Sequence, residues 1–183
     1  MYWYGVDKEG RPILWERFSL FDWKKFNGKR KVLYYTALFE GIWSQMPEGT
    51  NEINVVAMTE GIPYLRAMAY PSFLLSVAKL FIAAFPDRLG AFSAQTTPVV
   101  TAVMKILSPI LPASIAGKMQ FFTRKAHVEH LVNEVLANGR ADLPDFLGGP
   151  AIHDPAVICS YAAMMKAANK AMVRAAQSQP RSE

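Results

Sequence analysis

The feature that most constrains the fold is a short β-branched run, INVVAM, at residues 53–58. The turn-forming residues TEG close this run after six residues, a length typical of a strand buried on both faces of a sheet. Two weaker runs of the same kind follow, AFSAQT at residues 91–96 and KMQFFT at residues 118–123. The apolar segments between them, at residues 70–85 and 99–111, are long enough to favour helix. This alternation of strand and helix predicts an α/β fold.

The flanking segments extend this pattern at both ends of the chain. The turn residues DKEGRP separate two β-prone runs, YWYG and ILWERF, and predict a hairpin-like opening. Further helices are predicted at residues 29–46, 127–137 and about 155–177, and LPDFLGGP at residues 143–150 allows only irregular backbone. No repeat, linker or low-complexity block divides the chain. We therefore expect one domain over residues 1–183, with its core at about 4–150.

Composition indicates a large apolar interior and a reducing compartment. Hydrophobic residues make up 51% of the chain and charged residues 19%, which fits either a large core or a core with an apolar cavity. The only cysteine, Cys159, excludes an internal disulfide. The first residues lack the pattern of a secretory signal, and Lys79 and Lys105 interrupt the two longest apolar segments. We expect a cytoplasmic protein that does not cross a bilayer.

The net charge of +5 is concentrated in two places, WKKFNGKRK at residues 23–31 and a helical stripe of Lys166, Lys170 and Arg174. Such clusters suit an anionic phospholipid surface or a nucleic acid, and a solvated basic face is the plain alternative. Nucleic-acid binding is the weakest of these hypotheses.

Motifs for common catalysis are absent from the sequence. It contains no G-x-S-x-G elbow, no P-loop and no G-x-G-x-x-G, so we expect no enzymatic activity and no cofactor. His127, His130 and Glu134 could share one helix face, but two imidazoles without further partners are more often surface residues, and no metal is expected. Cys159 lies in the apolar phase of a helix, where a buried, inert thiol is usual.

Several ordered motifs resemble the CRAL-TRIO family of lipid-binding domains. They are YGVDKEGRPILWERF, FPDRLGAFSAQTTPVVTAVMKILSPIL, GKMQFF and LPDFLGGP, which together span about residues 4–149. The resemblance implies a three-layer α/β/α fold with a mixed, mostly parallel sheet of about five strands and an amphipathic gate helix over a lipid pocket. The chain departs from the family where TTP replaces N-A-P and where Met58 stands in place of an Asp. Because the first predicted strand begins within the first few residues, we also expect the small helical domain that normally precedes this fold to be missing.

The resemblance assigns the gate to residues 99–111, and the residue pattern supports this assignment independently. A helix of about 13 residues spans roughly 20 Å, close to the length of an acyl chain. Pro98 suits a first helical turn, whereas Pro109 and Pro112 would loosen the end into a hinge. Lys105 points away from the expected inward stripe, which consists of Val99, Val103, Ile106, Leu107 and Ile110. The plain alternative is an ordinary core helix.

Headgroup and membrane contacts also follow from the resemblance. In phosphatidylinositol-binding members, an acid and a lysine contact the headgroup, and the matching residues are Asp87 and Lys118. A threonine usually lies three residues before that lysine. Here Ile115 occupies the position and Ser114 is its neighbour, so Ser114 is the candidate hydroxyl. Candidates for docking on an anionic membrane are Lys105, Lys24, Lys25, Lys29, Arg30 and Lys31.

These observations predict a peripheral membrane protein that carries one lipid without chemistry. The lipid would be a phosphoinositide, another phospholipid or another hydrophobic small molecule, exchanged through the hinged gate helix. The alternative is a protein-interaction scaffold of the same fold, of the kind that regulates small GTPases, with little or no pocket. The last helix would cover the site left open by the missing domain or form a homodimer contact; the residues on one side of it are Cys159, Ala162, Met165 and Met172.

Overall fold

In the computed structural model, five strands form one mixed sheet whose spatial order, β1-β2-β3-β4-β5, is also their order in the chain. The structure describes residues 2–22, 32–33, 35–36, 39–40, 43, 46, 50–63, 76, 79 and 87–153. The antiparallel pair is β1 with β2, and every later pair is parallel. The strands are β1 (Tyr2–Val6), β2 (Pro12–Arg17), β3 (Ile53–Met58), β4 (Leu89–Gln95) and β5 (Met119–Phe122). The predicted hairpin and the mostly parallel five-stranded sheet are therefore confirmed.

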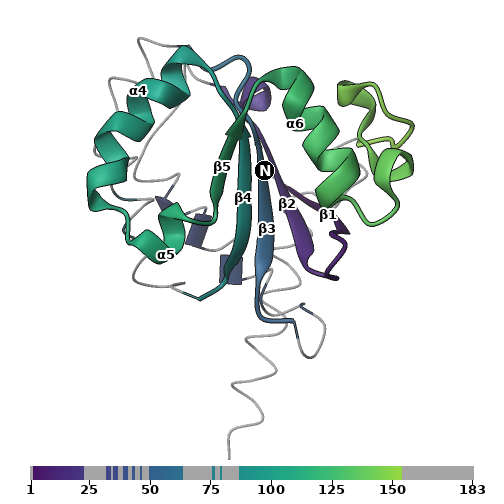
Figure 1. Cartoon of the computed structure of the whole chain (residues 1–183), viewed down its shortest axis with the longest axis horizontal. Coiled ribbons are helices and arrows are strands. Elements are labelled where there is room, and N and C mark those ends of the chain that lie inside the picture. Colours follow the sequence, from purple (N-terminus) through teal and green to yellow (C-terminus); the bar gives the residue numbers. More distant parts are fainter. Residues whose placement is uncertain are drawn as a thin grey trace, which may run out of the picture.

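Segments on both faces cover this sheet, as Figure 1 shows. The crossover from β4 to β5 contains α4 (Pro98–Leu107), a 3₁₀ turn (Ser108–Ile110) and α5 (Ala113–Ala116), all on one side, which we call the α4 face. After β5 the chain crosses to the other side, the α6 face, and forms α6 (Arg124–His130). Crossovers between parallel strands are right-handed, so successive crossovers that advance in one direction along a sheet lie on the same face. The segment after β5 is not such a crossover, and it covers the opposite face.

Alternation along the strands supplies a separate hydrophobic cluster to each face. In β2, Leu14 packs into the α4-face cluster, while Ile13 and Trp15 belong to the α6-face cluster. In β3, Val55 packs into the α4-face cluster and Val56 into the α6-face cluster. Successive side chains of a strand point to opposite faces, so a central strand that is covered twice is apolar throughout. This explains why the whole of β3 is buried.

The α6 face is covered by one continuous segment. A π-helical turn (Leu131–Val135) follows α6, and its wider winding lets Leu131, Val135 and Leu136 all pack on the sheet. Two 3₁₀ turns come next, Gly139–Asp142 and Asp145–Leu147, and Leu143 between them is buried in the same cluster.

A tight turn at the end of this segment requires glycine. A Cβ at Gly149 would lie 1.9 Å from the Leu143 carbonyl oxygen, so a side chain cannot fit there. Gly148 has a φ of +83°, which other residues rarely adopt. The irregular backbone predicted for LPDFLGGP is confirmed as a 3₁₀ turn with this glycine pair after it.

His153 holds the end of the segment against the hairpin. Its Nδ1 lies 3.1 Å from the Tyr2 hydroxyl, and its ring makes edge contacts with Tyr4, Trp15 and Phe146. The last described residues are therefore fixed to β1 and β2 at the opposite edge of the sheet from β5.

Four predicted helices differ from the structure or lie partly or wholly outside the described residues. The helix expected at residues 127–137 begins earlier, at Arg124, because the side chain of Thr123 caps it by accepting a hydrogen bond from the Ala126 N–H. The helices expected at residues 29–46 and 70–85 are described only at scattered positions, all of them helical except Met46. The predicted C-terminal helix, with Cys159 and its basic stripe, lies outside the described residues.

Candidate functional site

The helix α4 begins and ends at well-defined signals. Thr97 precedes it and accepts a hydrogen bond from the Val100 N–H to its side-chain oxygen at 3.3 Å, while Pro98 occupies the first helical position. After Leu107 the backbone tightens into the 3₁₀ turn that contains Pro109. This turn breaks the regular helix at the point where the sequence predicted a hinge.

The apolar side of α4 is only partly covered. Val99 is buried, and the half-buried stripe consists of Val100, Val103, Met104 and Leu107. These positions follow i, i+3, i+4 and i+7, so the covered side is rotated slightly from the predicted one. Ile106 lies at its margin with 38% exposure, and Lys105 is exposed. The side chain of Ile110 lies outside the described residues.

The sheet presents aromatic and aliphatic side chains on the same face. Phe92 of β4 and Met119 of β5 pack at the border of the α4-face cluster, and the rings of Phe92 and Phe121 lie 6.1 Å apart. Leu111 and Ile115, which follow α4, pack against this cluster. The described part of the α4 face is therefore mostly apolar from β2 to β5. Glu16 of β2 adds a buried carboxylate to it, which accepts a hydrogen bond from the Tyr35 hydroxyl.

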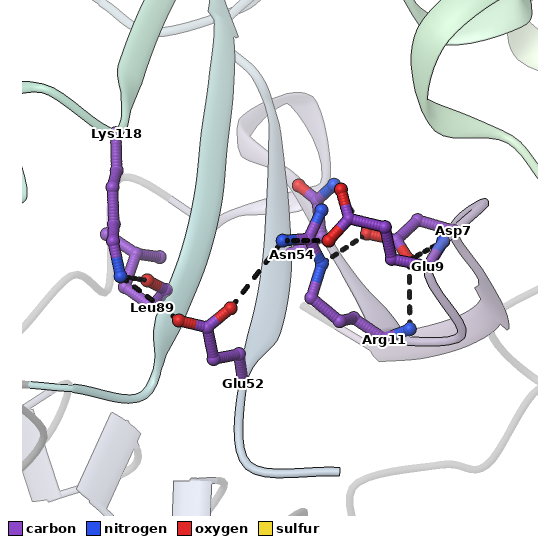
Figure 2. Close-up of polar contacts among 7 residues, drawn as sticks. All are labelled: Asp7, Glu9, Arg11, Glu52, Asn54, Leu89 and Lys118. Carbon is purple, nitrogen blue, oxygen red and sulfur yellow. Dashed lines mark hydrogen bonds and ion pairs between the residues drawn. The ribbon is translucent and has the colours of Figure 1, made fainter.

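A chain of ion pairs crosses the amino-terminal edge of the parallel strands, as shown in Figure 2. Lys118, just before β5, donates to the Leu89 carbonyl oxygen at 2.5 Å and pairs with Glu52 at 3.1 Å. The other carboxylate oxygen of Glu52 lies 3.5 Å from Arg11, which also pairs with Glu9 at 3.0 Å. We call this set, with Asp7 and the neighbouring Asp87 and Arg88, the amino edge.

Asp7 fixes Arg11 in the middle of this chain. The carboxylate of Asp7 is buried and accepts hydrogen bonds from the Arg11 N–H at 2.9 Å, from Arg11 Nε at 2.7 Å and from Asn54 Nδ2 at 3.3 Å. Burial acts to lower the pKa of Arg11, but the hydrogen bond and charge of Asp7 outweigh it and raise the pKa above its ordinary value. Arg11 therefore stays charged and held in place.

The predicted headgroup residues lie at or near this edge without forming one cluster. Lys118 reaches the start of β4, two residues beyond Asp87, yet its carboxylate partner is Glu52. Asp87 and Ser114 are exposed, and Ile115 is buried in the α4-face cluster. The docking candidates Lys24, Lys25, Lys29, Arg30 and Lys31 lie outside the described residues.

Sequence reasoning missed Glu52 and Arg11 as members of this site. Arg11 was assigned only to turn chemistry, and Glu52 stands alone before the β3 run. The signal available was their position: residues that precede parallel strands meet at one edge of the sheet. The order of neighbouring strands decides which of them touch, and no motif specified that order.

The two histidines of α6 contact side chains of the sheet. His127 is fully buried with Nε2 3.1 Å from the Ser93 hydroxyl, and burial lowers its pKa to about 4. His130 stacks on Phe122 at 4.4 Å, and burial lowers its pKa as well. Within the described residues, no group of three His, Cys, Asp or Glu side chains could hold a metal ion.

An open hollow of about 580 Å³ lies at the β5 edge of the sheet, lined by Gln120, Phe121, Phe122, His130 and Glu134. It is a surface feature at the sheet edge, separate from the ion-pair chain of Figure 2. In the part of the chain that the structure describes, no helix has the length and apolarity to span a membrane.

A comparison with protein-family models matches the CRAL/TRIO domain over residues 1–149. The fold, an α/β domain with an amphipathic helix over a mostly apolar sheet face, agrees with that match. The chain therefore belongs to the CRAL/TRIO domain family, whose members bind lipids and other small hydrophobic molecules and are generally not enzymes. A search of curated proteins finds no match.

Proposed function

We propose that this domain binds one amphipathic lipid, a phosphoinositide or another phospholipid, beneath α4 and exchanges it at membrane surfaces without chemistry. The observation that carries the proposal is α4 itself. It is capped at Thr97, interrupted at its far end by Pro109, and half-covered along one apolar side above a sheet face that is mostly apolar in its described part. A fully packed core helix would bury that side completely.

The energetics of a lipid explain why such a helix is useful. Each methylene group brought into water costs about 0.8 kcal/mol, so two acyl chains would cost on the order of 25 kcal/mol to expose. A binding site as apolar as the bilayer makes extraction nearly neutral, provided that its cover opens only at the membrane. Lys105, exposed on α4, would meet anionic headgroups there, at about 1 kcal/mol per basic residue.

The cargo can be identified directly from the purified full-length chain. Organic extraction followed by mass spectrometry should recover about one lipid per protein molecule, since a closed site retains its ligand. Recovery of no lipid, from the protein as purified and after incubation with phospholipid vesicles, would contradict the proposal and favour the scaffold alternative.

The role of α4 can be tested with a charge placed on its apolar side. Val103→Asp should lower lipid transfer between vesicles roughly tenfold, because an unpaired carboxylate facing an apolar site is costly. Ile152→Asp is the matched control, since Ile152 is 73% exposed at the other edge of the sheet. Circular dichroism would show whether both variants keep the fold. Equal transfer by the two variants would rule out a lipid beneath α4.

A further inference from the structure

The amino edge is electrostatically unlike the rest of this basic chain. Although the whole sequence carries a formal charge of +5, the described residues of the amino edge include four carboxylates and only three cations. The carboxylates are Asp7, Glu9, Glu52 and Asp87, and the cations are Arg11, Arg88 and Lys118. An additional anion arriving here therefore meets no surplus of positive charge.

Glu52 holds the position that an anionic ligand would need. One of its carboxylate oxygens lies 3.1 Å from Lys118 Nζ, and the other faces Arg11 at 3.5 Å. A phosphate oxygen pair placed between the same two cations would make the same contacts. Of the three N–H donors of Lys118, one binds the Leu89 carbonyl oxygen and one binds Glu52, so a phosphate that bridges Lys118 and Arg11 takes the place that Glu52 holds between them.

Burial separates the fixed part of this network from the exchangeable part. Asp7 is 2% exposed and forms several hydrogen bonds, so its pairing with Arg11 is permanent. The side chains of Glu52 and Lys118 are about one-third exposed, at 36% and 33%. A partly exposed ion pair contributes little to stability, and water or another anion can replace it at small cost.

From this arrangement we propose that Glu52 is an internal counter-ion that selects against anionic headgroups, and that a phosphate group binds Lys118 only by displacing it. The inference rests on the proposed function, because it assumes that the lipid headgroup reaches the amino edge. When Glu52 moves away, the hydrogen bond to Leu89 keeps the Lys118 ammonium in place for the incoming phosphate. Glu52 thus sets the preference between phosphatidylinositol, which is anionic, and phosphatidylcholine, which has no net charge.

The test compares bound lipids after the full-length protein is incubated with vesicles of phosphatidylcholine and phosphatidylinositol in equal amounts. Glu52→Gln should raise the ratio of bound phosphatidylinositol to bound phosphatidylcholine about fivefold, the size of one partly exposed charge contact. Glu60→Gln is the matched control, because Glu60 also forms an exposed ion pair, with Arg124, but away from the amino edge. It should leave the ratio unchanged.

A second experiment tests whether the effect of Glu52→Gln on the lipid ratio requires Lys118. It also keeps the test from relying on a single variant. In a Lys118→Gln background, Glu52→Gln should no longer change the ratio, because the cation that the phosphate would contact is gone. An unchanged ratio in Glu52→Gln with lipid still bound, or an increase that persists without Lys118, would overturn the inference while leaving the proposed function intact. If neither the unaltered protein nor any variant binds lipid, both the inference and the proposed function are wrong.

Discussion

The imidazole of His127 has no exposed surface beneath α6, where its Nε2 lies 3.1 Å from the Ser93 hydroxyl. A histidine in this position is neutral in the folded protein, because burial penalises the charged form. Burial lowers the pKa to about 4, and the charge of His130 acts in the same direction. In the unfolded chain the ordinary pKa is about 6.5.

This difference makes stability depend on pH. The unfolded state takes up the proton near pH 6.5, whereas the folded state resists until about pH 4, so the free energy of unfolding falls as the pH decreases through this window. Urea unfolding should show about 2 kcal/mol less stability from this group at about pH 5 than at about pH 7. His127→Gln should remove this part of the dependence. His130→Gln is the comparison, and an equal change in both variants would show that burial of His127 is not the cause.

The role of His127 illustrates what the sequence could not determine at this scale. The spacing of HVEHLVNE placed three candidate metal ligands near one helix face, yet one of them, His127, contacts a serine of the sheet 34 residues earlier in the chain. Helical spacing identifies neighbours on the same helix only. Contacts between elements depend on strand order, which local sequence does not specify.

At the scale of single elements, α4 and α6 both begin with a threonine N-cap. Thr97 and Thr123 each accept a hydrogen bond from the N–H group three residues later. Thr97→Ala should destabilise α4 by about 1 kcal/mol, and Thr123→Ala should do the same to α6. Hydrogen exchange should therefore accelerate about fivefold in the amides of the altered helix alone. Acceleration of both helices in either variant would mean that the two open together.

The sequence predicted these elements unevenly, for physical reasons. The strand at Ile53–Met58 was predicted with its observed bounds because burial on both faces leaves a continuous apolar run. The start of α6 was missed because Arg124 and Lys125 are exposed and carry no apolar periodicity. The apolar side of α4 was predicted with a slight rotation, since Val100 and Met104 are apolar as well and spacing alone does not choose between them.

At the scale of the whole molecule, both hydrophobic clusters share one sheet. Ile13 and Leu14 are adjacent in β2 and fully buried, one on the α6 face and one on the α4 face. Because one strand supplies both clusters, we expect a single cooperative unfolding transition. Ile13→Ala and Leu14→Ala should each lower the free energy of unfolding by about 2–5 kcal/mol. Fluorescence and circular dichroism should give the same midpoint, and two separate transitions would show that the faces unfold independently.

The overall architecture was the part most accessible from sequence. Four motifs in a fixed order indicated the α/β fold, because each strand and turn has its own local signature. The amino-edge network was not accessible, since Arg11, Glu52 and Lys118 come from three distant segments that meet only when β2, β3, β4 and β5 align. Partly exposed charged residues of this kind look the same in sequence whether they are paired or solvated.

The agreement between strand order and chain order also bears on how the protein is made. On the ribosome, each new strand emerges beside the one just completed, so the nascent sheet grows at a single edge and each strand after the first finds a neighbour already synthesised. The α6 face is different. Trp15, Val56 and Met58 lack their cover until Leu131–Leu143 has been translated. This side is therefore where a chaperone would bind during synthesis, and where a truncated chain would aggregate.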